Sequence, residues 1–334
     1  MTHDVRIRGT DVHFPCLAGQ TLLDAALQVG IELPYSCRKG VCGQCAGAIT
    51  SGDVRCSPSD AVAAGQYLYC QCVPASDVEI VPAAWHRSDP SARRRFVTKV
   101  YRNTRPADDI SVLQLRLPVG RRARFRAGQY LQVVLPDGSR RSYSMANPPH
   151  ESDMLQLHIR HVPGGRFTQV VPTLAPGDTL TVELPFGTFG LRENSTAPIW
   201  CVVGGTGFSP VRSLLDDMMK RGIRRAVTLV WGARRADGLY QMPVVERWRK
   251  AWPDFRFIPV LEEACDAQAI GAFHGRVDEA VRRHAGALVR HEVYCCGAPP
   301  MVAAVKAVCI EDFGLDPQDF ISDVFVPGPA VPPP

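Results

Sequence analysis

Short runs of alternating hydrophobic and polar residues mark the first part of the chain. Residues 5–8 and 12–16 alternate with a period of two, which is typical of β-strands and predicts a hairpin. Three further short strands are expected, near 46–49, 67–70 and 78–81. We therefore expect residues 1–82 to form a small module of their own.

One short helix is expected inside this module, over residues 21–29. Thr21 is the predicted N-cap, and Asp24, three residues later, is its capping-box partner. Gly30 follows the last apolar position and is the predicted stop.

Strand-like runs dominate the next part of the chain, which we delimit as 96–192. The runs lie at 96–101, 110–117, 129–135, 155–162 and 179–184. Turn-forming Gly and Pro residues separate them, and regular spacing of short strands predicts an antiparallel barrel. The stretch 83–95, with a proline and a basic run, is expected to be a linker.

From residue 193 the pattern changes to an alternation of strands and helices. Apolar runs of strand length are followed by amphipathic stretches of helix length, ending in a helix near 301–313. This alternation predicts a parallel sheet with crossover helices over 193–326. The proline-rich tail, 327–334, is expected to be disordered.

The composition is that of an ordinary globular protein. The 334 residues are 46% hydrophobic and 21% charged, enough to build two or three cores. Residues 1–81 hold eight Asp or Glu and five Lys or Arg, whereas the whole chain carries +5. The acidic first part could dock onto the basic remainder of the chain, or the basic part could bind cofactors that carry phosphate. The charges could equally belong to ordinary solvent-exposed surfaces. The longest apolar run, 199–203, is too short to span a membrane. We expect a soluble, cytoplasmic protein without a membrane or nucleic-acid partner.

A cluster of cysteines, YSCRKGVCGQC (35–45), lies in a loop that has little to bury. Its members are Cys37, Cys42 and Cys45. Twelve cysteines in a chain of this size, without an export signal, are expected to be metal ligands or buried thiols rather than disulfides. The Cys-x4-Cys-x2-Cys spacing is that of plant-type 2Fe-2S ferredoxins, and Gly40 and Gly43 would let the backbone wrap a cluster. Zinc is the competing interpretation, but no second cysteine clip is evident.

Three cysteines further along the chain are candidates for the fourth ligand, namely Cys56, Cys70 and Cys72. The stretch YLYCQCVPASDVEI resembles the ferredoxin segment in which the ligand precedes Pro by four residues. That resemblance implies Cys70, and leaves Cys72 as a packing thiol.

The stretch RSYSMANPP (141–149) resembles the Arg-x-Tyr-Ser motif of the ferredoxin-NADP reductase family. The resemblance implies that Arg141 meets flavin phosphate and that Tyr143 stacks on the flavin. Ser144 would form a hydrogen bond near flavin N5, where hydride arrives. Otherwise, the same residues could be a strand with an exposed Arg and a packed Tyr.

A second stretch, HIRHVPGGRFT (158–168), resembles the other flavin segment of that family. The predicted contacts with FAD, rather than FMN, are made by His158, Arg160, Val162, Gly164, Gly165, Phe167 and Thr168. The two glycines and the start of a helix at Phe167 and Thr168 would offer backbone N–H groups to the pyrophosphate.

A glycine-rich turn lies between a strand and a helix in CVVGGTGFSPVRSLL (201–215). It lacks the last glycine of the Rossmann fingerprint. The turn residues, Gly204, Gly205, Thr206 and Gly207, would still allow a nucleotide pyrophosphate to approach. Ser209 and Pro210 are the expected N-cap and N1 of the helix that follows.

Two later segments resemble nucleotide-binding parts of the same family. LVWGARRADGLY (229–240) would contact the adenosine half of NAD(P)H, and Arg234 and Arg235 could bind a 2′-phosphate, which favours NADPH over NADH. YCCGAPPMV (294–302) would place Cys296 and Gly297 beside the nicotinamide.

The end of the chain departs from the plant-type pattern. The aromatic residue that covers the flavin is the terminus there, whereas here Phe325 is followed by nine residues. Phe325 remains our candidate for the flavin cover, and for a catalytic role together with Ser144 and Cys296. The role of Asp323 stays open.

The order of these modules resembles the reductase components of aromatic-ring-hydroxylating dioxygenases over nearly the whole chain. The resemblance implies a multidomain protein with a β-grasp-like 2Fe-2S ferredoxin, an antiparallel FAD barrel and a parallel-sheet α/β NAD(P)-binding domain. It implies an oxidoreductase that takes hydride from NAD(P)H onto FAD and passes single electrons through the cluster to a separate Rieske oxygenase. The alternatives are the reductase of a di-iron monooxygenase or of a sugar-deoxygenating system, and a non-catalytic redox sensor.

Overall fold

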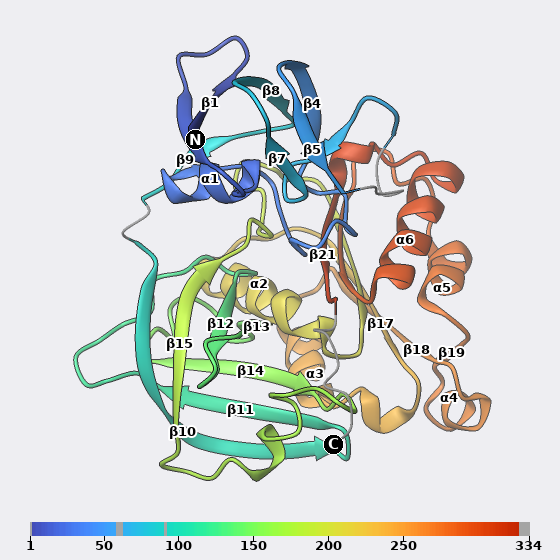
Figure 1. The fold of residues 1–334 in the computed structure, drawn as a ribbon. Coiled ribbons are helices and arrows are strands. Elements are labelled where there is room, and N and C mark those ends of the chain that lie inside the picture. The colour runs from blue at the N-terminus through green and yellow to red at the C-terminus, as the bar shows by residue number, and fades with distance from the viewer. Residues whose placement is uncertain (1, 58–62, 90–91, 327–334) are drawn as a thin grey trace. The chain divides into compact units, whose positions relative to one another are not determined.

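The fold divides into two compact units in the computed structural model, which describes residues 2–57, 63–89 and 92–326 (Figure 1). The first unit runs to Arg93 and includes Gly187–Phe189. The second holds both the barrel and the parallel sheet, which we expected as separate domains. The predicted disordered tail, 327–334, lies outside the described residues.

The first unit is built on a five-stranded mixed sheet in the order β2-β1-β8-β4-β6. Its strands are β1 (Thr2–Ile7), β2 (His13–Leu17), β4 (Ala46–Ser51), β6 (Tyr67–Leu68) and β8 (Val78–Pro82). β1 and β8 run parallel, and the other pairs are antiparallel. With the single helix α1 (Leu22–Gln28), which buries most of its residues, this arrangement confirms the β-grasp-like prediction.

Helix α1 begins as the sequence predicts. The hydroxyl oxygen of Thr21 accepts a hydrogen bond from the Asp24 amide at 3.1 Å, and Gly30 follows the helix with φ +79°. The predicted capping box is wrong in its second half, because the Asp24 carboxylate is instead paired with the guanidinium of Arg38.

Part of the predicted linker is ordered, which the sequence did not indicate. Strand β9 (His86–Arg87) pairs with β3 (Ile31–Glu32), and the His86 ring lies 2.6 Å from the Glu32 carboxylate. These two residues of the predicted linker are therefore paired with the first unit, and the linker itself stays a prediction. A two-residue strand is too short to show the alternation that would have predicted it.

The second unit begins with a six-stranded antiparallel sheet in the order β13-β12-β15-β10-β11-β14. Its strands are β10 (Arg94–Ala107), β11 (Ile110–Arg116), β12 (Tyr130–Val134), β13 (Arg140–Ser144), β14 (Met154–Arg160) and β15 (Thr179–Phe186). A bridge between Met145 and Leu157 joins the two edge strands, so the sheet closes into the predicted barrel. Leucine, valine and isoleucine side chains from all around the barrel fill its core.

A six-stranded parallel sheet completes the second unit, in the order β19-β18-β17-β16-β20-β21. Its strands are β16 (Ile199–Gly204), β17 (Val227–Ala233), β18 (Phe255–Leu261), β19 (Phe273–His274), β20 (Glu292–Gly297) and β21 (Phe320–Val324). Strands β17, β18 and β19 follow one another outward on one side of β16, and β20 and β21 lie on its other side. The strand order therefore reverses between β16 and β20. Ligands of open parallel sheets bind at the carboxyl ends of strands at such a reversal.

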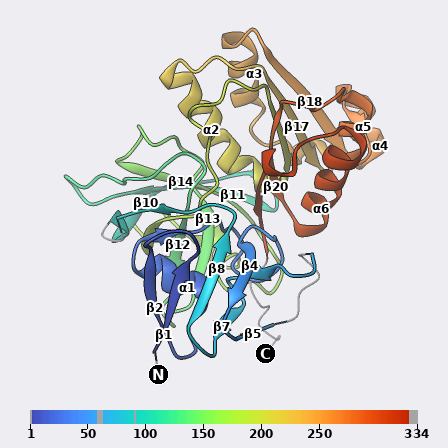
Figure 2. The ribbon, with the colours of Figure 1, turned by 90° about the horizontal axis from the view of Figure 1, so that it is seen from above.

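Helices cover both faces of the parallel sheet, with α2 and α3 on one face and α5 and α6 on the other (Figure 1, Figure 2). The helices are α2 (Phe208–Arg221), α3 (Met242–Ala251), α4 (Ala264–Ile270), α5 (Val277–His284) and α6 (Pro299–Ala307). Helix α6 continues as a wider turn over Val308–Asp312, so the last predicted helix is confirmed. No helix in the described parts of the chain is long and apolar enough to cross a membrane.

Cys56 and Cys72 form a disulfide, which corrects two expectations. Strands β5 (Val54–Cys56) and β7 (Cys72–Pro74) pair antiparallel and place these two residues opposite each other, with their Cα atoms 4.1 Å apart. Cys72 is therefore not a packing thiol, and this chain does use a disulfide. Neither strand was predicted, so the sequence offered no reason to bring the two cysteines together.

We expect Cys56→Ser to lower the stability of the first unit by about 3 kcal/mol, because the disulfide closes a loop with a sequence separation of 16. Urea unfolding of the unreduced full chain, followed by signals of the first unit, measures the effect. Cys265→Ser, at an exposed cysteine, is the matched control. Equal stability of the two variants, or ready alkylation of Cys56 in unreduced denatured protein, would contradict the pairing.

Candidate functional site

The cysteine loop between β3 and β4 winds tightly because several of its residues are left-handed. Gly40 and Gly43 have φ of +74° and +73°, and Arg38 has φ +55°. A Cβ on Gly40 would lie 2.9 Å from the Gln71 side chain, so this position also lacks room for a side chain. The winding brings the side chains of Cys37 and Cys42 together, and the two glycines have the backbone freedom that the predicted close wrapping requires.

Cys37, Cys42, Cys45 and Cys70 gather at this loop as two sulfur pairs. The Cys37 and Cys42 thiols are hydrogen-bonded to each other, and so are those of Cys45 and Cys70. No three of these sulfurs lie within 4.8 Å of one another, since the one such trio of ligand atoms among the described residues lies elsewhere. A single zinc would hold all four sulfurs about 3.8 Å apart. Two separate pairs would instead suit two irons. Cys70 lies where a fourth ligand would be needed, and its role as that ligand stays a prediction.

Backbone amides favour the thiolate form of cysteines in this loop, which is the form that an iron would need. The Lys39 amide donates to Cys37 Sγ at 3.3 Å. The Cys42 thiol, followed by the amides of Lys39, Val41 and Cys42, lowers the pKa of Cys37 to about 5. The Cys45 thiol lowers the pKa of Cys70 to about 7. One sulfur of each pair is thus stabilised as a thiolate, and the ion pair from Arg38 to Asp24 ties the loop to α1.

Arg141, Tyr143 and Ser144 all lie on β13, on the barrel. The Arg141 side chain is half-exposed, and the Tyr143 ring lies 5.5 Å from that of Phe167. Burial raises the pKa of Tyr143 above its ordinary value, so the phenol stays neutral. The Arg141 guanidinium donates to the carbonyl of Arg140 at 2.9 Å. The motif therefore presents a half-exposed cation and a neutral ring beside the second flavin segment.

The second flavin segment forms turns rather than the predicted helix start at Phe167 and Thr168. The first regular element after it is a 3-10 helix at Val171–Thr173. Gly164 has φ +73°, and the amides of Arg166, Phe167 and Thr168 have no hydrogen-bond partner in the described part of the chain. Three successive unpaired N–H groups form an anion-binding nest. The residues present therefore fit a pyrophosphate without a helix.

Three other predicted flavin residues have protein partners. Arg160 is paired with Asp109 at 2.6 Å, and the carbonyl of Val162 accepts hydrogen bonds from the Gly165 amide and the Thr168 hydroxyl. Both ring nitrogens of His158 bind protein groups. A contact of His158 with FAD would therefore have to come from its main chain.

The glycine-rich turn lies at the carboxyl end of β16, where the strand order reverses. Gly205–Gly207 is a 3-10 turn that runs directly into α2. A Cβ on Gly207 would lie 2.2 Å from the Cys296 carbonyl oxygen, and one on Gly204 would lie 2.6 Å from Met301 Sδ. The turn is thus pressed against the end of β20, and any side chain at these positions would push it outward.

The predicted cap of α2 is wrong, although the helix itself is confirmed. The helix begins at Phe208 with Gly207 as its N-cap residue, so Ser209 and Pro210 lie inside the first turn. The 3-10 turn already supplies helical geometry and makes a serine cap unnecessary.

Ser144, Cys296 and Asp323 meet from three different strands. The Ser144 hydroxyl donates to Asp323 Oδ2 at 3.3 Å in a buried setting, and Cys296 lies opposite Asp323 in the pairing of β20 with β21. Burial, and then the Asp323 charge, raise the pKa of Cys296 well above its ordinary value. The sequence left the role of Asp323 open because the end of the chain departs from the plant-type pattern.

Gly297 and Phe325 lie at the carboxyl ends of the neighbouring strands β20 and β21. Phe325 is half-buried directly after β21, and its amide donates to the Gly297 carbonyl at 2.9 Å. This places Phe325 within the group of strand ends that holds Ser144 and Cys296. Its part in covering the flavin stays a prediction.

Three family models match successive parts of the chain. They describe a 2Fe-2S iron-sulfur cluster binding domain over residues 5–75, an oxidoreductase FAD-binding domain over 98–190 and an oxidoreductase NAD-binding domain over 201–307.

Curated relatives and a solved structure match along nearly the full length. Terephthalate 1,2-dioxygenase, reductase component 2, from Comamonas sp. is 52% identical over 98% of this chain and 99% of its own. The CDP-6-deoxy-L-threo-D-glycero-4-hexulose-3-dehydrase reductase of Yersinia pseudotuberculosis is 32% identical over the same shares. The crystal structure of the Amycolatopsis cytochrome P450 reductase GcoB is 31% identical with a TM-score of 0.79, and covers 98% of this chain and 99% of its own.

This chain belongs to the family of iron-sulfur flavoprotein reductases. The reductase uses FAD, a 2Fe-2S cluster and NAD(P)H as its cofactors. FAD accepts hydride from the nicotinamide and releases electrons singly, which the cluster can take up. The predictions of family, fold class, enzyme class and cofactors are thus confirmed. The roles of individual residues stay proposals.

Arg234 and Arg235 lie just past β17, with side chains that are 80% and 62% exposed. The first lies 3.2 Å from Glu263 and the second 3.9 Å from Asp237. Both pairs are exposed and therefore weak. The guanidinium groups of Arg234 and Arg235 are thus available to bind a phosphate at this end of the sheet.

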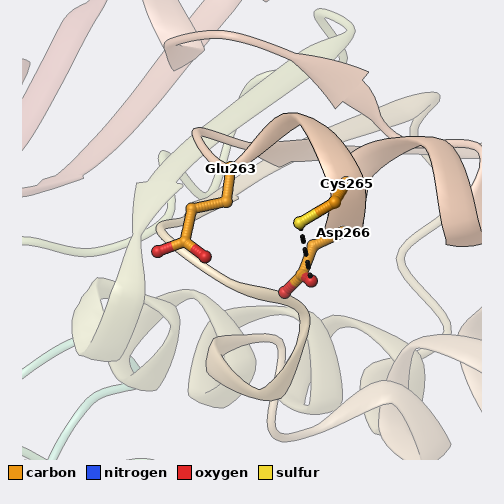
Figure 3. Close-up of side chains that lie close together, drawn as sticks. All are labelled: Glu263, Cys265 and Asp266. Atoms are coloured by element: carbon orange, nitrogen blue, oxygen red, sulfur yellow. Dashed lines mark hydrogen bonds between the residues drawn. The ribbon is translucent and has the colours of Figure 1, made fainter.

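Glu263, Cys265 and Asp266 come close together near this point, as Figure 3 shows. The two carboxylates already have partners outside the group. Asp266 accepts from the Ala236 amide at 2.8 Å, Glu263 pairs with Arg234, and the Cys265 thiol lies 3.7 Å from Asp266. We interpret the group as support for the loop after β17 rather than as a metal site.

We expect Gly207→Ala to lower kcat/KM for NAD(P)H at least about tenfold, because the added methyl displaces the turn from its place against β20. FAD and iron contents should stay at wild-type levels. Steady-state reduction of ferricyanide measures the effect. Gly286→Ala is the matched control, since a Cβ there meets nothing within 4 Å. Equal activity of the two variants would exclude this turn as the nucleotide site.

Proposed function

We propose that this reductase supplies electrons to a Rieske oxygenase of the terephthalate 1,2-dioxygenase type. The supporting observation is 52% identity across 98% of the chain to a reductase component of that system, against 32% to a sugar-deoxygenating reductase. The cysteine pairs, the flavin motif and the glycine-rich turn are all present in one chain, which disfavours a non-catalytic redox sensor. The expected cytoplasmic location and the absence of membrane or nucleic-acid partners stay predictions.

The residues around Ser144 would guide hydride transfer without acid or base catalysis. Ser144, Cys296 and Asp323 are all buried, so water is kept from the place where the nicotinamide would meet the flavin. With FAD bound, the Ser144 hydroxyl, which donates to Asp323 here, would help to orient the flavin. The neutral Cys296 thiol offers a small apolar surface for the nicotinamide, and Phe325 would shield the flavin until the nucleotide arrives.

Electron delivery to a matched pair of acceptors tests the proposed function. With NADPH and the reductase, the oxygenase component of a terephthalate 1,2-dioxygenase should consume oxygen only when terephthalate is present. The hydroxylase of a di-iron monooxygenase, offered at the same concentration, should be reduced at least about tenfold more slowly. Faster reduction of the di-iron protein would favour the alternative partner.

We expect Cys42→Ala to abolish electron transfer to cytochrome c or the oxygenase and to leave NADPH-ferricyanide activity unchanged. The variant loses one iron ligand in the first unit, whereas the flavin and nucleotide groups belong to the second, and ferricyanide takes electrons from flavin. Cys265→Ser should retain both activities. Loss of ferricyanide activity in a flavin-loaded Cys42→Ala protein would contradict the assignment.

We further propose that NADPH is preferred over NADH, because Arg234 and Arg235 can bind the 2′-phosphate. Alanine at either position should lower kcat/KM for NADPH about tenfold and leave that for NADH nearly unchanged. Glu263→Gln, which frees Arg234, should raise the preference for NADPH. Arg256→Ala, at an exposed arginine of β18, is the control. Equal efficiency with both nucleotides in the wild type and in Arg235→Ala would exclude this role.

A further inference from the structure

A buried hydrogen-bond network connects the barrel with the nucleotide-binding half of the second unit. At its centre is His158 on β14, which is 4% exposed. Its Nδ1 lies 2.9 Å from the Tyr240 hydroxyl. Its Nε2 lies 3.1 Å from Gln156 Nε2 and 3.3 Å from Arg212 Nη1. Tyr240 and Arg212 belong to the nucleotide-binding half, so a single imidazole contacts both halves.

The partners determine which nitrogen of His158 carries the proton. Arg212 can only donate, so Nε2 must accept and the proton must lie on Nδ1, where it is donated to the Tyr240 oxygen. Burial, and then the positive charge of Arg212, hold the pKa of His158 well below its ordinary value. The imidazole is therefore neutral, and this network has one arrangement of donors and acceptors rather than two.

The network continues into the helix that follows the glycine-rich turn. Arg212 lies on α2, and its Nε is 3.5 Å from Asp216 one turn later. Asp216 in turn accepts a hydrogen bond from Trp248 Nε1 of α3 at 2.8 Å. The next residue of α2, Ser213, donates to the carbonyl oxygen of Asn147 in the barrel at 2.8 Å. The first turns of α2 are thus fixed to the barrel at two adjacent positions.

A third contact lies at the glycine-rich turn itself. The Arg160 guanidinium, two residues beyond His158 on β14, lies 3.0 Å from where a Cβ of Gly205 would be. Strand β14 therefore faces both the turn and the helix that would hold the nucleotide pyrophosphate. Arg160 is also paired with Asp109, so its guanidinium is shared between this pair and the turn. The imidazole network is the buried and specific part.

We propose that His158 is a positioning residue for hydride transfer, which holds the start of α2 at a fixed place relative to the barrel and so sets the approach of the nicotinamide to the flavin. The proposal rests on the hydride-transfer activity of the reductase. His158 itself touches neither reactant through its side chain, since both ring nitrogens are taken by protein groups. A misplacement of about 1 Å can cost hydride transfer up to about a hundredfold, even when both ligands still bind.

His158→Leu tests the proposal in the full-length, cofactor-loaded protein. In anaerobic stopped flow, the limiting rate of flavin reduction at saturating NADPH should fall at least about tenfold. The apparent Kd of NADPH and the FAD content should change less than about twofold. Two further readouts do not depend on turnover. The long-wavelength absorbance of the stacked flavin and nicotinamide should weaken, and amide hydrogen exchange in the first turns of α2 should speed up.

Three further variants separate positioning from loss of structure. His158→Gln retains an acceptor for Arg212 and should restore most of the rate lost in His158→Leu. Tyr240→Phe keeps the ring volume but removes the hydroxyl that binds His158 Nδ1. It should lower the limiting rate of flavin reduction about threefold. This variant tests the proposal if His158→Leu does not fold. His284→Leu, at a half-buried histidine of α5 that packs on Phe273 away from this network, should leave the rate unchanged.

The outcomes are distinct. An unchanged limiting rate and an unchanged absorbance in folded His158→Leu, or in Tyr240→Phe if His158→Leu does not fold, would overturn the positioning role. A rate that falls only in proportion to lost FAD would overturn it as well, because it would show a merely structural role. Failure of wild-type protein to be bleached by NADPH would instead overturn the reductase activity itself.

Discussion

Hydride transfer needs contact, and this requirement explains how the protein is divided. The reacting atoms of nicotinamide and flavin must approach to about 3.5 Å with the correct orientation, whereas a single electron does not require contact. The flavin barrel and the nucleotide-binding sheet accordingly form one compact unit, although they are different folds. They are joined by buried groups such as Ser144 with Asp323 and His158 with Arg212. The cysteine loop belongs to the other unit.

The cysteine loop is governed by a different constraint, the need to hold charged sulfur and iron in a segment that has few apolar side chains of its own. Left-handed residues wind the loop so that four sulfurs meet as two pairs, and amides such as that of Lys39 point at the sulfur atoms. The loop is anchored to α1 through Arg38 and Asp24. The metal would thus be part of the folding energy of this unit.

Local patterns predicted the chemistry well and the connections between segments poorly. The spacing of the cysteines and the glycine-rich turn were enough to predict the cofactors, because each of these patterns lies within one short segment. The disulfide of Cys72 depends on two three-residue strands, which are too short to show alternation. The contact of Asp323 with Ser144 depends on β21, which is buried along most of its length and therefore shows no alternation either. His158 was taken for a flavin residue because it lies in a flavin segment, and only the fold brings Tyr240 to its ring. Contacts between side chains that are far apart in the sequence produce no periodic pattern that a single sequence could show.

The order in which the two chromophores are reduced tests the central claim most directly. Oxidised protein is mixed anaerobically with NADPH carrying deuterium at the transferred position, and flavin and cluster absorbance are followed separately. Because hydride can be delivered only within the second unit, flavin reduction should come first and be slowed by deuterium, and cluster reduction should follow it. Reduction of the cluster before the flavin, or a flavin phase that is insensitive to deuterium, would contradict the account.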